Sequence, residues 1–204
     1  MTDIYLVRHG NTFDKGDVIT RVGARTDLPL SSSGMVQAEA LGGAFNELVP
    51  AGFAKAYCSP LLRTRQTAEA ILSASENAPE LKTLEFLREI DYGPDENQPE
   101  DNVIARLGQS AIEAWDREAV PPPGWNVDPA RLKQDWRELI AELGIDVMQQ
   151  PVLIVTSNGI ARFVLDAVTS MDTDLQSIKL KTGAYGLIQA ERATVSLTAW
   201  NVRP

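Results

Sequence analysis

The run Ile4-Tyr5-Leu6-Val7-Arg8-His9-Gly10-Asn11-Thr12 decides how this chain folds. Its first half is apolar and rich in residues that favour strands, which predicts a buried strand over Ile4–Arg8. Its second half changes abruptly to an imidazole, a glycine and an amide. Open α/β sheets place their ligand-binding groups at the carboxyl ends of strands. The run therefore predicts both a central strand and a binding site at its end.

The rest of the chain alternates short apolar runs with longer segments of helical period. This pattern predicts an α/β fold with three layers, α/β/α, around a mostly parallel sheet that has an antiparallel edge strand. The last two strands are separated by a short polar connection, which suits a hairpin. Besides the first strand, we expect strands at Ala54–Cys58, Thr83–Leu87, Val152–Thr156, Tyr185–Ala190 and Val195–Trp200.

Helix signals lie between the expected strands. Ser31 is a predicted N-cap, and Ser59 is another because Pro60 follows it in the first helical turn. A third helix is expected to begin at Asn158, directly after a strand. A fourth is expected over Pro129–Leu143, where the chain returns to the core.

The segment from Pro94 to Pro129 departs from this alternation. It is acidic, then amphipathic, and then interrupted by three consecutive prolines. We interpret it as a cap-like excursion from a single domain over residues 1–204, because a chain of this length suits one core. Trp115, Trp125 and Trp136 are expected to pack in that core, with a cap or a dimer contact as the alternatives.

Composition limits the classes of partner. The 204 residues carry a formal net charge of −9, which repels nucleic acid and anionic membranes, so we expect neither as a partner. Cys58 is the only cysteine, so an intramolecular disulfide is impossible and a reducing cytoplasm is the expected compartment. No stretch has the apolar length of a transmembrane helix. The composition leaves a homodimer open.

Polar residues follow three of the expected strands. They lie in the segments Leu6–Thr12, Ser59–Arg65 and Leu87–Gly93. Because parallel strands bring their carboxyl ends to one edge of the sheet, we expect these segments to meet there. Either Arg63 or Arg65 could reach this site, and the spacing from Ser59 favours Arg63.

The run Arg8-His9-Gly10 on an N-terminal strand resembles the signature of the histidine phosphatase superfamily, which includes the cofactor-dependent phosphoglycerate mutases. The later segments follow the order of that family, and Arg25–Gly34 is similar to its first loop and helix. The likeness runs from Ile4 to about Arg162 and weakens in the cap-like excursion. The resemblance implies a phosphoglycerate mutase-like fold.

The resemblance also implies a phosphatase that forms a phosphohistidine intermediate at His9. A neutral imidazole attacks phosphorus and divides one difficult displacement into two easier steps. Arg8 and Arg63 are implied as phosphate ligands, since a guanidinium grips phosphate oxygens in a bidentate way. Glu89 is implied as the acid that protonates the leaving oxygen, and Asn11 as a further hydrogen-bonding group. The expected partner is a small phosphorylated molecule, with no metal or cofactor.

These residues also have structural interpretations. A solitary histidine is often buried for packing alone, and Arg63 could be a solvated helix residue. Glu89 could pair with Arg88 on the surface. The acidic cluster of Asp95, Glu96, Glu100 and Asp101 is interpreted as a solvated loop rather than a metal site, because no pattern of metal ligands accompanies it.

One residue of the family pattern is missing. In the family, the strand that corresponds to Val152–Thr156 is followed by a second histidine, whereas Ser157 stands there in this chain, which contains a single histidine. A hydroxyl donates one hydrogen bond but supplies no cation, and the loss of one preorganised donor costs roughly 10²–10³ in rate. Ser157, Asn158, Arg21 and Arg162 are the candidates that could compensate.

Three functions follow from this departure. The favoured one is a slow or specialised phosphatase. The second is a protein that binds a phosphorylated ligand without hydrolysing it, as a sensor or regulatory partner. The third, a hydrolase that uses Ser157 and His9 in another reaction, is disfavoured because the glycine that precedes the nucleophile in such enzymes is absent. A phosphomutase is also disfavoured, because nothing in the pocket suggests that it protects a phosphoenzyme from water.

Overall fold

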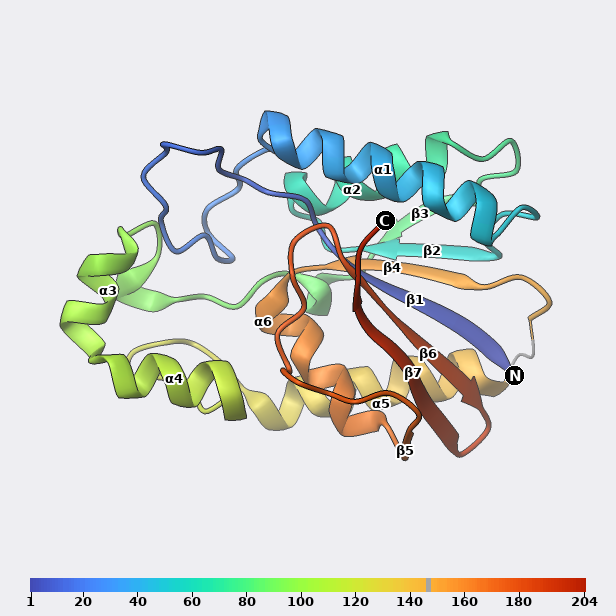
Figure 1. The fold of residues 1–204 in the computed structure, drawn as a ribbon. Coiled ribbons are helices and arrows are strands. Elements are labelled where there is room, and N and C mark those ends of the chain that lie inside the picture. The colour runs from blue at the N-terminus through green and yellow to red at the C-terminus, as the bar shows by residue number, and fades with distance from the viewer. Residues whose placement is uncertain (146–147) are drawn as a thin grey trace.

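A mixed sheet runs through the middle of the molecule (Figure 1). The computed structural model describes residues 1–145 and 148–204. The strands are β1 (Thr2–Arg8), β2 (Lys55–Cys58), β3 (Leu81–Thr83), β4 (Val152–Thr156), β5 (Ser170–Met171), β6 (Tyr185–Glu191) and β7 (Thr194–Val202). Their order is β3-β2-β4-β1-β6-β7-β5. Among the described strands, β6 runs antiparallel to both of its neighbours, β1 and β7, and the other neighbouring strands pair in parallel. The mostly parallel sheet and the antiparallel hairpin are confirmed.

The first strand contributes to the core on both faces of the sheet. Ile4 and Leu6 belong to one buried cluster, whereas Tyr5 and Val7 belong to another. This division follows from strand geometry, because successive side chains point to opposite faces. A strand that is covered on both faces is apolar throughout, which explains why the sequence of β1 shows no alternation.

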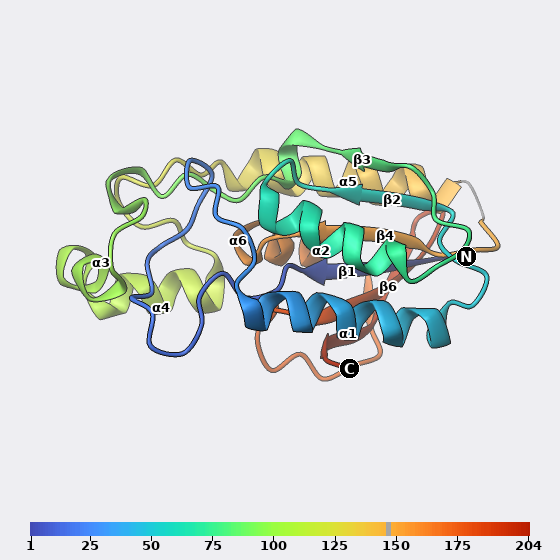
Figure 2. The same ribbon diagram turned by 90° about the horizontal axis from the view of Figure 1, so that it is seen from above.

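Helices cover both faces of the sheet and complete the three layers (Figures 1 and 2). On one face lie α1 (Ser32–Leu48) and α2 (Leu62–Ser73), and on the other lie α5 (Pro129–Ile145) and α6 (Asn158–Ala161). The predicted α/β/α architecture is therefore confirmed. Among the described residues, no helix combines the length and the apolar character needed to cross a membrane.

The segment from Pro94 to Pro129 contains α3 (Glu100–Leu107) and α4 (Gln109–Glu118). Both helices lie beyond the carboxyl ends of β1 and β4, close to the loop that joins β1 to α1 (Figures 1 and 2). Hydrogen bonds join this loop to the excursion, for example from the N–H of Arg21 to the carbonyl of Gln98 (2.9 Å). The three tryptophans Trp115, Trp125 and Trp136 are 1%, 7% and 0% exposed, which confirms that they pack inside.

The third strand is shorter and earlier than predicted. β3 pairs with β2 only from Leu81 to Thr83, and the expected strand residues Glu85–Leu87 form a 3-10 helix instead. β2 ends at Cys58, so the sheet offers no further ladder partners there. Leu87 is fully buried. Its apolar character therefore reflects core packing rather than a strand.

The predicted helix starts are confirmed at three of four places, one of which is Pro129, where α5 begins. The Oγ of Ser31 accepts a hydrogen bond from the N–H of Gly34 (3.2 Å), as an N-cap does, and α6 begins at Asn158 before it continues as the 3-10 helix Arg162–Ala167. The N-cap predicted at Ser59 is wrong, since α2 begins three residues later. The first-turn N–H of Leu62 donates to the carboxylate of Asp27 (2.7 Å), so a distant loop supplies the cap.

Two glycines allow the segment after β1 to approach α1 closely. A Cβ on Gly10 would lie 2.4 Å from the carbonyl oxygen of Gly34, and a Cβ on Gly34 would lie 2.0 Å from the carbonyl oxygen of Asn11. Both distances are too short for any side chain. The glycine that follows His9 in the predicted signature is thus required by packing, and it fixes the backbone on which that histidine stands.

Candidate functional site

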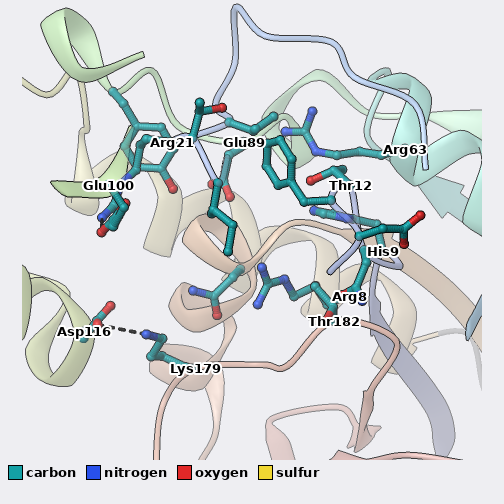
Figure 3. A pocket seen from close by; sticks show the side chains of 18 of the residues that line it. Arg8, His9, Thr12, Arg21, Arg63, Glu89, Glu100, Asp116, Lys179 and Thr182 are labelled. Atoms are coloured by element: carbon teal, nitrogen blue, oxygen red, sulfur yellow. Dashed lines mark hydrogen bonds and ion pairs between the residues drawn. The ribbon is translucent and has the colours of Figure 1, made fainter. Parts of the chain in front are cut away.

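A cavity of about 570 Å³ opens at the carboxyl ends of β1 and β4 (Figure 3). These two strands end side by side, because Arg8 is in register with Thr156. Apart from Ser157 and Arg162, the residues that the sequence predicted for the site all lie in its wall. They are Arg8, His9, Asn11, Arg21, Arg63, Glu89 and Asn158.

The imidazole of His9 is held in one orientation and one tautomer. Its Nδ1 lies 2.7 Å from the carbonyl oxygen of Gly10. A carbonyl only accepts, so Nδ1 carries the proton, and Nε2 of the neutral ring keeps a free lone pair. Burial, together with the charges of Arg63 and Arg8, holds the pKa of His9 well below its usual value of 6.5. The ring is therefore neutral at pH 7.

Two guanidinium groups flank this imidazole, and backbone carbonyls hold both. Arg8 donates to the carbonyl of Leu180 (2.9 Å), and the fully buried Arg63 donates to the carbonyls of Thr26 (3.0 Å) and Gly23 (3.3 Å). Burial lowers the pKa of Arg8 to about 10, so it stays charged at pH 7. Neither arginine forms an ion pair among the described residues, which leaves both charges available to an anion.

Of Arg63 and Arg65, Arg63 is the one that reaches the cavity. Arg63 points into the cavity, as Figure 3 shows. Arg65 instead lies on the exposed side of α2 and pairs with Glu69 (3.7 Å). The structural interpretation of Arg63 as a solvated helix residue is therefore wrong.

Glu89 is buried in the cavity wall and fixed by two backbone amides. Its Oε1 accepts from the N–H of Ile90 (2.9 Å) and its Oε2 accepts from the N–H of Gly159 (3.2 Å). A Cβ on Gly159 would lie 2.1 Å from Oε1, so a side chain there would displace the carboxylate. Surface pairing with Arg88 is also excluded, because Arg88 pairs with Glu85. Glu89 is held rigidly at the site.

Asn11 and Asn158 reach the cavity but are also used to hold its walls. The side-chain amide of Asn11 donates to the Oγ of Ser33 (3.1 Å) in the first turn of α1. The Oδ1 of Asn158 accepts from the N–H of Leu180 (2.9 Å) and so fixes the loop before β6. In Asn158 the Nδ2 group is left to face the cavity.

Ser157 is one of the two predicted site residues that the structure does not bring to the cavity wall. It follows β4 directly and is fully buried, and its Oγ has no hydrogen-bond partner among the described residues. In this structure Ser157 therefore adds no donor to the wall.

Arg21 and Arg162 occupy different places. Arg21 lines the cavity, forms an ion pair with Glu100, and lies against the rings of Tyr92 (5.3 Å) and Trp125 (5.1 Å). Arg162 stacks on Trp115 (4.2 Å) and is not part of the cavity wall. Of these two candidates for compensation, only Arg21 is placed to contact a ligand directly.

The sequence did not predict one group of charged residues at the site. Lys179 and Asp116 line the cavity and pair with each other at 2.8 Å, across the gap between α4 and the loop before β6. Glu100 lines it too, and because Glu100 begins α3 and Asp95 is buried, the interpretation of their acidic cluster as a solvated loop is wrong. None of the three stands in a motif, so no local signal in the sequence could have indicated them. Within residues 1–145 and 148–204, no three His, Cys, Asp or Glu side chains are placed to hold a metal ion.

Comparison with known proteins decides the family. The histidine phosphatase superfamily (branch 1) matches residues 4–203. The chain belongs to this superfamily. Among curated members, it is 30% identical over 147 residues to the fructose-2,6-bisphosphatase TIGAR of Xenopus tropicalis, covering 69% of this chain and 50% of the relative. It is 31% identical over 127 residues to the 2,3-bisphosphoglycerate-dependent phosphoglycerate mutase of Rhizobium etli, covering 61% and 59%.

Solved structures of the superfamily share the fold. A mycobacterial glucosyl-3-phosphoglycerate phosphatase superposes with a TM-score of 0.78 at 19% identity, covering 99% of this chain and all of the other. At that identity the likeness concerns the fold alone. The match to the curated relatives spans only about half of their length. The phosphoglycerate mutase-like fold that the resemblance implied is confirmed.

The charge state of His9 can be measured without ambiguity, because the chain contains one histidine. In an NMR titration of the untagged protein, we expect its ring signals to stay at the neutral position through pH 6.5 and to shift only well below it. The lowered pKa is the reason, since burial and two cations oppose protonation. The ¹⁵N shifts should report a proton on Nδ1. A midpoint at or above 6.5, or a proton on Nε2, would contradict this geometry.

Proposed function

We propose that the protein is a phosphatase that hydrolyses a small phosphorylated molecule through a phosphohistidine at His9. The observation that carries the proposal is a neutral imidazole that is anchored through Nδ1 and flanked by two arginines, neither of which forms an ion pair among the described residues. Membership of the superfamily and the phosphatase names of its relatives agree with this proposal.

The reaction proceeds in two displacements. The lone pair of His9 Nε2 attacks phosphorus as the bond from phosphorus to the ester oxygen breaks, and Glu89 gives a proton to that leaving oxygen. Water then attacks the phosphorus while Glu89 takes one of its protons. The bond from phosphorus to Nε2 breaks, which releases inorganic phosphate and restores the neutral imidazole.

Arg8 and Arg63 stabilise the charge on the phosphoryl oxygens in both displacements. Phosphoryl transfer depends chiefly on such positioning and charge compensation. The carbonyls of Leu180, Thr26 and Gly23 hold the two guanidinium groups before the substrate arrives. Little reorganisation is then needed when the charge develops.

The absence of a second imidazole is the proposed reason for low activity. We infer that Asn158 Nδ2 supplies a hydrogen bond in its place, since Ser157 does not reach the cavity and Arg162 is not in its wall. An amide supplies no positive charge. Asn158 therefore recovers only part of the rate enhancement, roughly 10²–10³-fold, that the lost donor would give.

A second candidate function is the binding of a phosphorylated ligand without turnover. The burial of Ser157 outside the cavity wall favours it, because the site is one donor short of the family pattern. A hydrolase that uses Ser157 as nucleophile has no such support. The Oγ of Ser157 has no hydrogen-bond partner among the described residues, so no base activates it.

Hydrolysis of p-nitrophenyl phosphate in metal-free buffer separates the two candidates. We expect measurable turnover that falls by roughly 10³-fold or more in His9→Ala, the scale typical of losing a covalent nucleophile. Ser157→His restores the family pattern and should raise turnover by up to about a hundredfold, since it returns a cationic donor to the site. Equal rates in wild type and His9→Ala would exclude the nucleophile. If both the wild type and Ser157→His bind phosphate but show no turnover, the second candidate function, binding without hydrolysis, is favoured.

The proposed acid role of Glu89 predicts a dependence on the leaving group. Glu89→Gln should slow the hydrolysis of an alkyl phosphate by roughly 10²-fold or more. Its effect on p-nitrophenyl phosphate should be much smaller, because nitrophenolate leaves without a proton. Gly159→Ala should show the same pattern more weakly, since its Cβ would displace the carboxylate.

The matched control is Gly43→Ala, which lies in α1 with open space around it and should change neither rate. If Glu89→Gln slows both substrates equally, the carboxyl group does not protonate the leaving oxygen. If Gly159→Ala slows both equally, glycine at 159 serves packing only.

A further inference from the structure

Most of the charged residues of the cavity lie either beside the neutral His9 or at the opposite end, with Glu89 between them (Figure 3). We call the end around His9 the inner end and the opposite one the outer end. The inner end consists of Arg8, His9 and Arg63, and the outer end consists of Arg21, Glu100, Asp116 and Lys179. The proposed phosphoryl transfer uses the inner end together with Glu89 and Asn158, so the outer end faces the rest of the substrate.

The two ends differ in how their cations are neutralised. At the inner end neither arginine has an ion-pair partner among the described residues. At the outer end Arg21 pairs with Glu100, and the Nζ of Lys179 lies 2.8 Å from Asp116. Each outer cation thus already has a carboxylate, and both carboxylates line the cavity themselves.

The charge balance of the whole wall allows little more than one phosphate group. The lining holds five cationic side chains against four carboxyl groups, with His9 neutral. The fifth cation, Lys15, is exposed at the mouth, where solvent screens its charge. A second anion at the outer end would have to displace Glu100 or Asp116 from its partner and leave a carboxylate facing it, which is unfavourable.

The outer end instead suits hydroxyl groups. Carboxylate oxygens accept hydrogen bonds from hydroxyls, and an ammonium donates to them. Thr12, Thr20 and Thr182 also line the cavity, but Thr12 lies beside His9 and Thr182 beside Arg8, at the inner end (Figure 3).

We propose that the substrate is a phosphate monoester of an uncharged, hydroxyl-bearing group, and that Glu100 and Asp116 exclude molecules with a second anionic group. The proposal rests on the proposed phosphatase function and adds the substrate class. Glu100 and Asp116 are specificity-determining residues in this account. Their carboxylates repel a second anion directly, and they keep Arg21 and Lys179 from attracting one.

Two probes that differ in one group test the selectivity. Glycerol 3-phosphate carries a hydroxymethyl group where 3-phosphoglycerate carries a carboxylate, and their ester bonds are alike. Wild-type enzyme should favour glycerol 3-phosphate in kcat/KM by about tenfold or more, a modest value for one unpaired charge. Equal values of kcat/KM for the two probes, or a higher value for 3-phosphoglycerate, would overturn the proposal.

The variant Asp116→Asn assigns the selectivity to the outer end. It frees Lys179 and removes a negative charge, so it should raise kcat/KM for 3-phosphoglycerate by about tenfold while changing that for glycerol 3-phosphate little. Glu69→Gln, which removes the carboxylate of a remote surface pair on α2, is the matched control and should leave the ratio unchanged. An unchanged ratio in Asp116→Asn would overturn the assignment.

Failure of the phosphatase function is distinguished by a binding measurement. Dissociation constants of both probes are measured on the inactive His9→Ala variant and on the double variant that also carries Asp116→Asn. Glycerol 3-phosphate should bind His9→Ala more tightly than 3-phosphoglycerate does, and the double variant should show a smaller difference. Absence of turnover on p-nitrophenyl phosphate would contradict the proposed function alone. Equal affinity for the two probes would contradict the substrate class whether or not the protein turns them over.

Discussion

The hydrogen bond from His9 Nδ1 to the carbonyl oxygen of Gly10 is the interaction on which the site depends. It fixes the tautomer, so that Nε2 is the nitrogen with a free lone pair. The carbonyl is itself held in place, because Gly10 and Gly34 bring this segment against the first turn of α1 more closely than any side chain would allow. Helix packing therefore determines which ring nitrogen can react.

The distribution of charge makes the two ends of the cavity different. Burial lowers the pKa of the imidazole, and so do the charges of the fully buried Arg63 and the partly buried Arg8. These two arginines have no ion-pair partner among the described residues, so they attract an anion to the same end. The ion pairs Arg21–Glu100 and Lys179–Asp116 cancel the positive charge at the other end. A substrate with one phosphate thus has one favourable orientation, with its ester oxygen toward the centre of the cavity and Glu89.

The sequence predicted what is encoded locally. The buried strand before His9, the cap at Ser31 and the site residues at the ends of β1 and β4 each follow from a short pattern of residue types. The cap of α2 did not, because the carboxylate of Asp27 comes from a distant loop. The end of β3 depends on where β2 stops, and the pairing of Lys179 with Asp116 joins residues 63 positions apart. Such features arise from tertiary contacts, which no local pattern contains.

The central claim, that His9 carries the phosphoryl group, is tested most directly by trapping the intermediate. The enzyme is mixed with excess p-nitrophenyl phosphate, quenched in alkali within milliseconds and analysed by ³¹P NMR and peptide mass spectrometry. The account predicts a phosphate bound to nitrogen, stable in base and labile in acid, on the peptide that contains His9. Turnover in which the quenched protein carries no phosphate, or carries it on a serine oxygen, would contradict the account.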